Sequence, residues 1–384
     1  MNITKTVRVV FALLFAFAVT AKGVDLIPDL DVPYEPTHPQ VVNAMLSLAE
    51  VSDDDILYDL GCGDGRIVIS GITDFNAKRG VGIDIDPRRI REANERAKGY
   101  EVQDKVEFIE ADIMDSDIRD ASVVAIYLLN SVNFMIRPKL FSDLQPGTRV
   151  VSHAFHMTEW NEDRKVYHER ARNKSIYYWV IPAHLGGAWS WKSGGSEVKM
   201  ELTQKFQEVS GSLAYDSDSR FDIKDAEVNG KQFSFKTEEE HDGKIVTVEY
   251  EGNVKGDRIK GTRTQGEKRG SRTQKWTAER EPADLYGRWS IAFDGDKSSY
   301  NGILDISRNK TGIIASFMMD ERADINVIKQ AYVWGGSIYL QLPLSGSEDK
   351  LLISGNLLGK TGAGTMRNEM WGPVEYKWTG ERLK

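Results

Sequence analysis

A strand-like run that ends in three closely spaced glycines constrains this chain more than any other feature. The segment "YDLGCGDGRIVI", Tyr58 to Ile69, places Gly61, Gly63 and Gly65 between an apolar strand pattern and a helix-like run. A glycine-rich turn between a strand and a helix lets the backbone approach a bound ligand closely. Turns of this kind hold dinucleotides, nucleoside triphosphates or S-adenosylmethionine (SAM), so neighbouring residues have to decide the ligand class.

The spacing around the turn argues against two of these classes. A nucleoside-triphosphate loop ends in Gly-Lys-Ser/Thr, whereas Arg66 and Ile67 follow the last glycine here. A dinucleotide fingerprint has the spacing Gly-x-Gly-x-x-Gly, and the spacing here is Gly-x-Gly-x-Gly. Glycines alone are a weak signal, so the acidic residues nearby carry more of the argument.

Three aspartates lie at the ends of three successive predicted strands. Asp59 would repel a pyrophosphate but suits an ammonium group. Asp84, in "GVGIDIDP", can accept hydrogen bonds from both hydroxyls of a ribose. Asp112, in "VEFIEAD", is placed to accept a hydrogen bond from an exocyclic adenine amine. A ligand with a cationic amino-acid end, a ribose and an adenine is SAM.

The chain around the turn alternates strand and helix patterns. Strands are predicted at 56–60, 80–85, 105–110, 122–128 and 148–152, and helices at 39–51, 65–73, 87–99 and 130–144. This alternation predicts an α/β fold with a doubly wound, mostly parallel sheet. "KVYHERA" and "SIYYWVIP" add a predicted edge hairpin, which makes seven strands. Thr37 is the predicted N-cap of the first helix, with Gln40 in capping-box register.

From Gly186 the pattern changes to short alternating runs that repeat once. "GAWSW", "GNVKG" and "KWTAER" are matched about 100 residues later by "GRWSI", "GNLLG" and "KWTGER". In "VKMELTQKF", Val198, Met200, Leu202 and Phe206 share one face at strand period. We therefore expect two small antiparallel β units, each a barrel or sandwich, at 184–282 and 283–384. The α/β domain is expected at 22–183.

The N-terminus resembles an export signal. Lys5 and Arg8 precede the apolar run "VVFALLFAFAVTA", Val9 to Ala21, which is too short to span a bilayer. Residues 1–21 are therefore predicted to be a signal peptide, with export to the periplasm or outside the cell if Met1 is the true start. A later start would leave the protein cytoplasmic. No stable membrane span is expected after cleavage.

Charge and residue counts limit the kinds of partner and chemistry that we expect for this chain. The net charge of −8 gives no reason to expect nucleic acid as a partner. The single cysteine, Cys62, sits where the turn requires a small residue, so packing rather than nucleophilic chemistry explains it. No metal is expected either, because "HAFH" lacks further ligands at usable spacing.

At these motifs the chain resembles the class I, Rossmann-like SAM-dependent methyltransferases, over roughly Pro33 to Pro182. The resemblance implies that Asp59, Gly61, Gly63 and Gly65 hold the methionine part of SAM, Asp84 the ribose and Asp112 the adenine. "PYEPTHPQVVNAML" and "RPKLFSDLQPGTRVVSHAFHMTEW" are similar to non-SET protein-lysine methyltransferases. That likeness implies that Tyr34 and Thr37 line the SAM pocket. Tyr127, in "IYLLNS", completes the expected cofactor-binding set.

Three residues after the fifth strand are candidates for acid–base work. They are His153, His156 and Glu159. The alternative is that His153 is a satisfied strand-end histidine and His156 a solvated loop residue. The absence of Asn/Asp-Pro-Pro-Tyr in "IYLLNS" disfavours methylation of nucleobases.

The sequence thus predicts a SAM-dependent methyltransferase, with a protein lysine amine as one candidate acceptor. The β units are expected to bind or position a substrate. Two alternatives stay open: a small-molecule methyltransferase, and an exported binding protein that keeps the fold without turnover.

Overall fold

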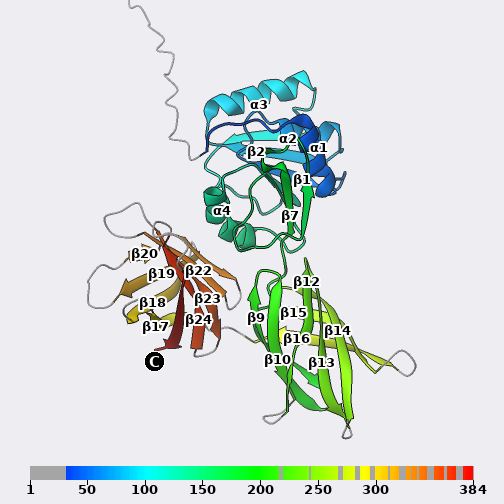
Figure 1. Ribbon diagram of the computed structural model, residues 1–384, viewed down its shortest axis with the longest axis vertical. Coiled ribbons are helices and arrows are strands. Elements are labelled where there is room, and N and C mark those ends of the chain that lie inside the picture. The colour runs from blue at the N-terminus through cyan, green and yellow to red at the C-terminus, as the bar shows by residue number, and fades with distance from the viewer. Residues whose placement is uncertain are drawn as a thin grey trace, which may run out of the picture.

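The computed structural model shows an α/β domain followed by two β units (Figure 1). It describes residues 32–215, 219–241, 244–266, 271–281, 286–294, 299–309, 312–319, 326–328, 330–334, 337–343, 350–358, 361–368 and 375–383. The predicted signal peptide, residues 1–21, lies outside the described residues. None of the helices in the described ranges has the length and hydropathy needed to cross a bilayer.

The α/β domain is built on a mixed seven-stranded sheet, which confirms the predicted fold class. Its strands are β1 (Ile56–Leu60), β2 (Arg79–Asp84), β3 (Val106–Glu110), β4 (Val123–Ile126), β5 (Arg149–His153), β6 (Arg164–Tyr167) and β7 (Ser175–Val180). They lie in the order β3-β2-β1-β4-β5-β7-β6. The first five are parallel, and β7 runs antiparallel to both β5 and β6. The predicted edge hairpin is therefore confirmed.

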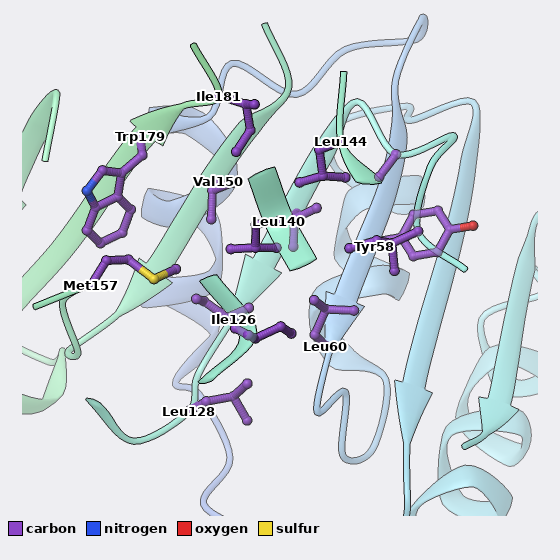
Figure 2. Packing of buried hydrophobic residues seen from close by; sticks show 14 of the residues in the cluster. Tyr58, Leu60, Ile126, Leu128, Leu140, Leu144, Val150, Met157, Trp179 and Ile181 are labelled. Atoms are coloured by element: carbon purple, nitrogen blue, oxygen red, sulfur yellow. The ribbon is translucent and has the colours of Figure 1, made fainter. Parts of the chain in front are cut away.

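Helices cover both faces of this sheet because its strands are apolar on both sides. They are α1 (Pro39–Leu48), α2 (Arg66–Thr73), α3 (Pro87–Gly99) and α4 (Asn130–Asp143). On one face, Leu140 and Leu144 at the α4 end pack with strand residues such as Ile126, Val150 and Trp179 (Figure 2). On the other face, α1 and α2 pack against side chains such as Leu57 and Val151.

The first helix begins differently from the prediction. His38, not Thr37, is the N-cap, and its Nδ1 accepts a 3.2 Å hydrogen bond from the Gln40 amide. The Thr37 hydroxyl instead contacts His153 Nδ1 at 3.2 Å. The capping-box prediction was wrong because a tertiary partner competes for the threonine hydroxyl.

The two β units share one topology, as the sequence repeat predicts. The first contains β8 (Gly187–Ser193), β9 (Ser196–Lys205), β10 (Glu208–Ala214), β11 (Arg220–Asp222), β12 (Lys224–Asn229), β13 (Gln232–His241), β14 (Lys244–Lys255), β15 (Arg258–Gln265) and β16 (Arg272–Arg280). The second contains β17 (Gly287–Asp294), β18 (Ser299–Asn309), β19 (Gly312–Met319), β20 (Asn326–Ile328), β21 (Gln330–Trp334), β22 (Ser337–Pro343), β23 (Lys350–Leu358), β24 (Thr361–Asn368) and β25 (Glu375–Arg382). The strand orders are β11-β10-β9-β8-β16-β15-β14-β13-β12 and β20-β19-β18-β17-β25-β24-β23-β22-β21. In each unit the first strand pairs with the last, in the middle of the sheet. The two ends of each sheet also come together, with β10 near β12 and β20 near β22, so each sheet has a barrel-like form.

The repeated motifs have a shared structural cause. Gly252 pairs with Gly261 across β14 and β15, and Gly355 pairs with Gly364 across β23 and β24. In each unit the tryptophan of the "KWT" motif donates an indole hydrogen bond to the carbonyl just before the first glycine. A Cβ at Gly355 would lie 2.3 Å from Trp378. At Gly252 the space of a side chain is taken by Ile259, and at Gly261 and Gly364 it is taken by the backbone of the neighbouring strand. All four positions are therefore too crowded for a Cβ.

The first β unit contacts the α/β domain through the turn between β9 and β10. Phe206, expected to face the β-unit core, lies in this turn with a φ of 57° and packs against Trp160 and Phe141 of the α/β domain. The inward position that ends β9 is occupied by Gln204, which binds the linker backbone. Gln207 accepts a 2.5 Å hydrogen bond from the Trp160 indole. The strand prediction was right to Lys205, and the face assigned to Phe206 was wrong.

Candidate active site

A pocket lies at the carboxyl ends of β1, β2 and β4, beneath the segment that precedes α1. Ligands of open α/β sheets bind at this edge, where the strand order reverses. Most of the residues predicted to bind the cofactor line this pocket: Tyr34, Thr37, Asp59, Gly61, Gly63, Asp84, Asp112 and Tyr127. The strand ends therefore bring together side chains that are up to 93 positions apart in the chain, from Tyr34 to Tyr127.

The glycine turn itself needs glycine at all three positions. Gly61, Gly63 and Gly65 have φ values of 79°, 53° and 74°, a region that other residues rarely adopt. A Cβ at Gly63 would lie 2.6 Å from the Tyr34 ring. A Cβ at Gly65 would lie 2.5 Å from Phe108, so this glycine permits close packing of α2 rather than lining the pocket. Gly65 is thus placed for packing, while the other two border the ligand space.

The Asp84 carboxylate is oriented by backbone amides of the glycine turn and of the residues that follow β2. One carboxylate oxygen accepts the Gly63 amide at 2.8 Å, and the other accepts the Asp86 amide at 2.9 Å. Each oxygen retains a second lone pair for a ligand hydroxyl. Burial raises the pKa of Asp84, although these two amides oppose that effect.

Asp59 adds a second carboxyl to the same pocket. It is buried, and its pKa lies well above the ordinary value because of burial first and then the nearby carboxyls of Asp84 and Asp64. Such a cluster of acids is unfavourable until a cation joins it. The electrostatics therefore suit a ligand that brings a positive charge to this end of the pocket.

Another part of the pocket is lined mainly by apolar side chains. Ile85, Ala111 and Ile113 line it together with Asp112. One oxygen of the Asp112 carboxylate accepts the Met114 amide at 2.8 Å, which orients the side chain. Apolar walls beside one hydrogen-bond acceptor suit a planar base with an exocyclic amine.

Residues 33–37 form a segment, which we call the N-terminal strap, that crosses the pocket. Tyr34 covers Gly63 and carries the Arg89 guanidinium 4.2 Å from its ring centroid. The Thr37 carbonyl accepts a 2.9 Å hydrogen bond from Arg66. Glu35 forms an ion pair with Arg172. These anchors come from α2, α3 and the β6–β7 connection, so the strap is tied to three separate parts of the domain.

His153 is one of these strap contacts and has both ring nitrogens engaged. Nδ1 lies 3.2 Å from the Thr37 hydroxyl, and Nε2 accepts a 3.0 Å hydrogen bond from the Arg172 amide. An accepting Nε2 requires the proton on Nδ1. Burial lowers the pKa of His153 to about 4, so the ring is neutral near pH 7. This geometry favours the satisfied strand-end histidine over a general base.

His156 and Glu159 lie in the loop after β5 and are not among the lining residues of the described pocket. His156 Nδ1 accepts the Thr158 amide at 2.9 Å. Glu159 pairs with the buried Arg137 at 3.2 Å. Burial alone would raise the pKa of Glu159, but Arg137 and the Thr158 hydroxyl lower it to about 2. Glu159 thus serves as a permanent counter-charge for Arg137.

Several lining residues have no part in the sequence prediction. Arg66, Arg89 and Glu35 line the pocket, and Asp64 binds Arg66 and Arg96 at 2.6 and 2.5 Å. Asp64 and Arg66 lie inside the glycine motif and could have been noticed there. Cys62 is buried against Gly82, and burial raises its pKa well above the ordinary thiol value, which agrees with a packing role.

Comparison with known proteins gives a consistent family. The ANTKMT methyltransferase domain matches residues 59–164. A protein-lysine N-methyltransferase of Saccharolobus islandicus (strain REY15A) is 46% identical over 154 residues, which cover 40% of this chain and 96% of that protein. The adenine nucleotide translocase lysine N-methyltransferase of Mus musculus is 30% identical over 131 residues, which cover 34% of this chain and 56% of that protein.

A solved structure of an RNA methyltransferase from Salinibacter ruber, in complex with S-adenosyl-L-homocysteine, is 49% identical. Its match has a TM-score of 0.38 and covers 39% of this chain and 96% of that one. The chain therefore spans nearly the whole length of two of these proteins and about half of the mouse enzyme. Each of these matches covers two fifths of this chain or less.

Proposed function

Since this chain belongs to the ANTKMT family of SAM-dependent methyltransferases, we propose that its α/β domain methylates a lysine side chain of a protein. The observation that supports this acceptor is the 46% identity to a protein-lysine N-methyltransferase over 96% of that protein's length. The β units lie outside that match, and we propose that they position the acceptor protein.

The pocket residues fit the parts of SAM. The part of the pocket that Gly61, Gly63 and the buried Asp59 line suits a cationic amino-acid end. Asp84 keeps one lone pair on each oxygen for the ribose hydroxyls. Asp112, between apolar walls, suits the adenine amine. We propose these roles for the five residues, and we propose that Gly65 supports the turn from behind.

Methyl transfer to an amine requires little covalent participation from the protein. Bound SAM supplies an electrophilic methyl group on a sulfonium. The chain has to align the amine with that methyl and allow the amine to lose its proton. His153 has no nitrogen free for this proton, and Glu159 is committed to Arg137. We therefore propose that alignment, not proton abstraction by either residue, is the main contribution of the domain.

The test is a transfer assay with tritiated-methyl SAM and an extract of the source cells. We expect label in protein, recovered as methyllysine after acid hydrolysis. Asp84→Ala is the inactive control, and Glu50→Gln, a change in a surface ion pair with Arg164 outside the pocket, is the matched active control. Label found only in RNA or only in small molecules would contradict the lysine acceptor.

The alternative of a binding protein without turnover makes a different prediction. It would bind SAM in a calorimeter but give no label above the Asp84→Ala background. Export also remains a proposal that rests on residues 1–21. Sequencing the N-terminus of the protein from fractionated cells would test it, since a mature protein that begins near Lys22 is expected in the envelope fraction.

A further inference from the structure

An unexplained cluster of polar groups lies where the N-terminal strap meets the end of β4. Glu35 and Tyr127 both line the pocket, and Glu35 forms an ion pair with Arg172. The side chains of Glu35 and Arg172 are 49% and 50% exposed. None of the roles given above to the SAM-binding residues uses this carboxylate.

The second group is the Tyr127 hydroxyl. The resemblance places Tyr127 in the cofactor-binding set, but none of the parts of SAM has been matched to this hydroxyl. Its oxygen is buried and has no hydrogen-bond partner in the described chain. Glu35 and Arg172 lie close enough to influence the pKa of Tyr127, which burial raises, yet neither meets the hydroxyl in hydrogen-bonding geometry. A buried hydroxyl without a partner is unfavourable, so its position in a pocket points to a ligand group that satisfies it.

The position of this pair separates it from the SAM-binding acids. Asp59 and Asp84 extend from β1 and β2, while Tyr127 follows β4 and Glu35 comes from the strap. The ring of Tyr127 is held 3.9 Å from the His153 ring, centroid to centroid, which orients it. The hydroxyl is therefore presented on a rigid support beside a partly exposed carboxylate.

We propose that Glu35 and the Tyr127 hydroxyl form the subsite for the lysine nitrogen of the acceptor, an inference that rests on the proposed function. The Glu35 carboxylate attracts the ammonium group of the acceptor lysine. This ammonium group competes with the Arg172 guanidinium for the carboxylate. Because the Glu35–Arg172 pair is half exposed, exchange of one cation for another costs little. The Tyr127 oxygen then accepts a hydrogen bond from the amine.

This arrangement accounts for each proton and electron pair. The ammonium first releases one proton to water and becomes an amine. An N–H bond to the Tyr127 oxygen orients the amine, and the nitrogen lone pair forms the new bond to the methyl carbon. The carbon–sulfur bond breaks with its electron pair on sulfur, which becomes a neutral thioether. The product is a methylammonium group that Glu35 can again hold.

The experiment compares Glu35→Gln and Tyr127→Phe with wild type in the tritiated-methyl assay, with the extract protein titrated as acceptor. We expect Glu35→Gln to raise the half-saturating acceptor concentration about tenfold, the effect of one lost charge-assisted hydrogen bond. We expect Tyr127→Phe to lower the maximal rate about tenfold through lost alignment. Calorimetry should show that both variants keep most of their affinity for SAM, because Arg66 and Arg89 still hold the strap over the pocket.

Two matched controls separate these effects from general ones. Glu50→Gln removes a carboxylate from a similar ion pair with Arg164, and Tyr100→Phe removes an exposed hydroxyl. If Glu35→Gln and Tyr127→Phe behave like these controls while wild type labels lysine, the inference is overturned and the proposed function stands. If they lose SAM affinity, the residues belong to the cofactor site and the inference is overturned too. If wild type itself labels no lysine, the proposed function fails.

Discussion

Acid should destabilise this domain through His153 more than through any exposed histidine. The ring is buried and neutral, with both nitrogens in hydrogen bonds, and its pKa is about 4 against an ordinary value of 6.5. A histidine with a lowered folded pKa takes up its proton more readily in the unfolded chain. Its contribution is therefore complete above pH 6.5 and is lost as the pH falls toward 4.

The expected loss follows from this shift. Between pH 7 and pH 5 the unfolded histidine becomes almost fully protonated while the folded one stays neutral, which costs about 2 kcal/mol. The assay is urea unfolding at both pH values for wild type and His153→Gln. The amide of glutamine can still donate and accept but does not titrate, so the variant should lose about 2 kcal/mol less than wild type on acidification.

Other groups also titrate in this range, so the comparison needs a control. His168→Gln changes a histidine that is not among the buried residues of the described chain. The His168→Gln variant keeps His153, so it should still show the loss of stability assigned to that residue. Parallel losses in wild type and His153→Gln would refute the account of His153 as a buried neutral histidine. The account also predicts that the pH profile of the maximal methylation rate keeps its shape in His153→Gln.

Three further outcomes are expected. Gly63→Ala places a Cβ 2.6 Å from the Tyr34 ring at a φ of 53°, so calorimetry should show SAM affinity weakened by about tenfold or more. Phe206→Ala removes a half-buried ring that packs against Trp160 and Phe141. It should lower the free energy of unfolding by about 2 kcal/mol, roughly half the cost of losing a fully buried phenylalanine ring. An unchanged denaturation midpoint would contradict the packing of the β9–β10 turn against the α/β domain. Binding of SAM should release protons at pH values where Asp59 is still protonated in the free protein, because a cation beside Asp59 lowers its raised pKa. A pH series of calorimetric titrations should show this as a buffer-dependent binding enthalpy, and Asp59→Asn should remove it.

The α/β fold, and the meeting of Asp59, Asp84 and Asp112 in one pocket, could be predicted because their signals are local. The glycine turn is a run of five residues, and Asp84 and Asp112 each follow a strand that its own apolar residues identify. The repeat in the β units was equally visible, since the glycine pairs and the tryptophans above them recur at nearly constant offsets.

The roles of the strap and of the loop after β5 could not be predicted in the same way, because their partners are distant. The hydroxyl of Thr37 forms a hydrogen bond with His153, which is 116 positions away, and does not cap the helix beside it. Glu159 forms an ion pair with Arg137, which lies 22 positions earlier on α4. The sequence does not reveal the orientation of that helix. Phe206 continues the alternation of inward and outward residues of β9 in the sequence. In the structure a turn at Phe206 directs its side chain to the α/β domain.

The strap also determines when the pocket can exist during synthesis of the chain. Its residues emerge from the ribosome early, yet two of its anchors, His153 and Arg172, follow more than 100 positions later. Until β5 and the β6–β7 connection have been made, only the anchors from α2 and α3, Arg66 and Arg89, can hold the strap over the pocket. A nascent chain therefore completes this pocket only when almost the whole α/β domain has been synthesised. SAM can then stabilise the folded domain by binding to it, but it cannot assist the earlier folding steps.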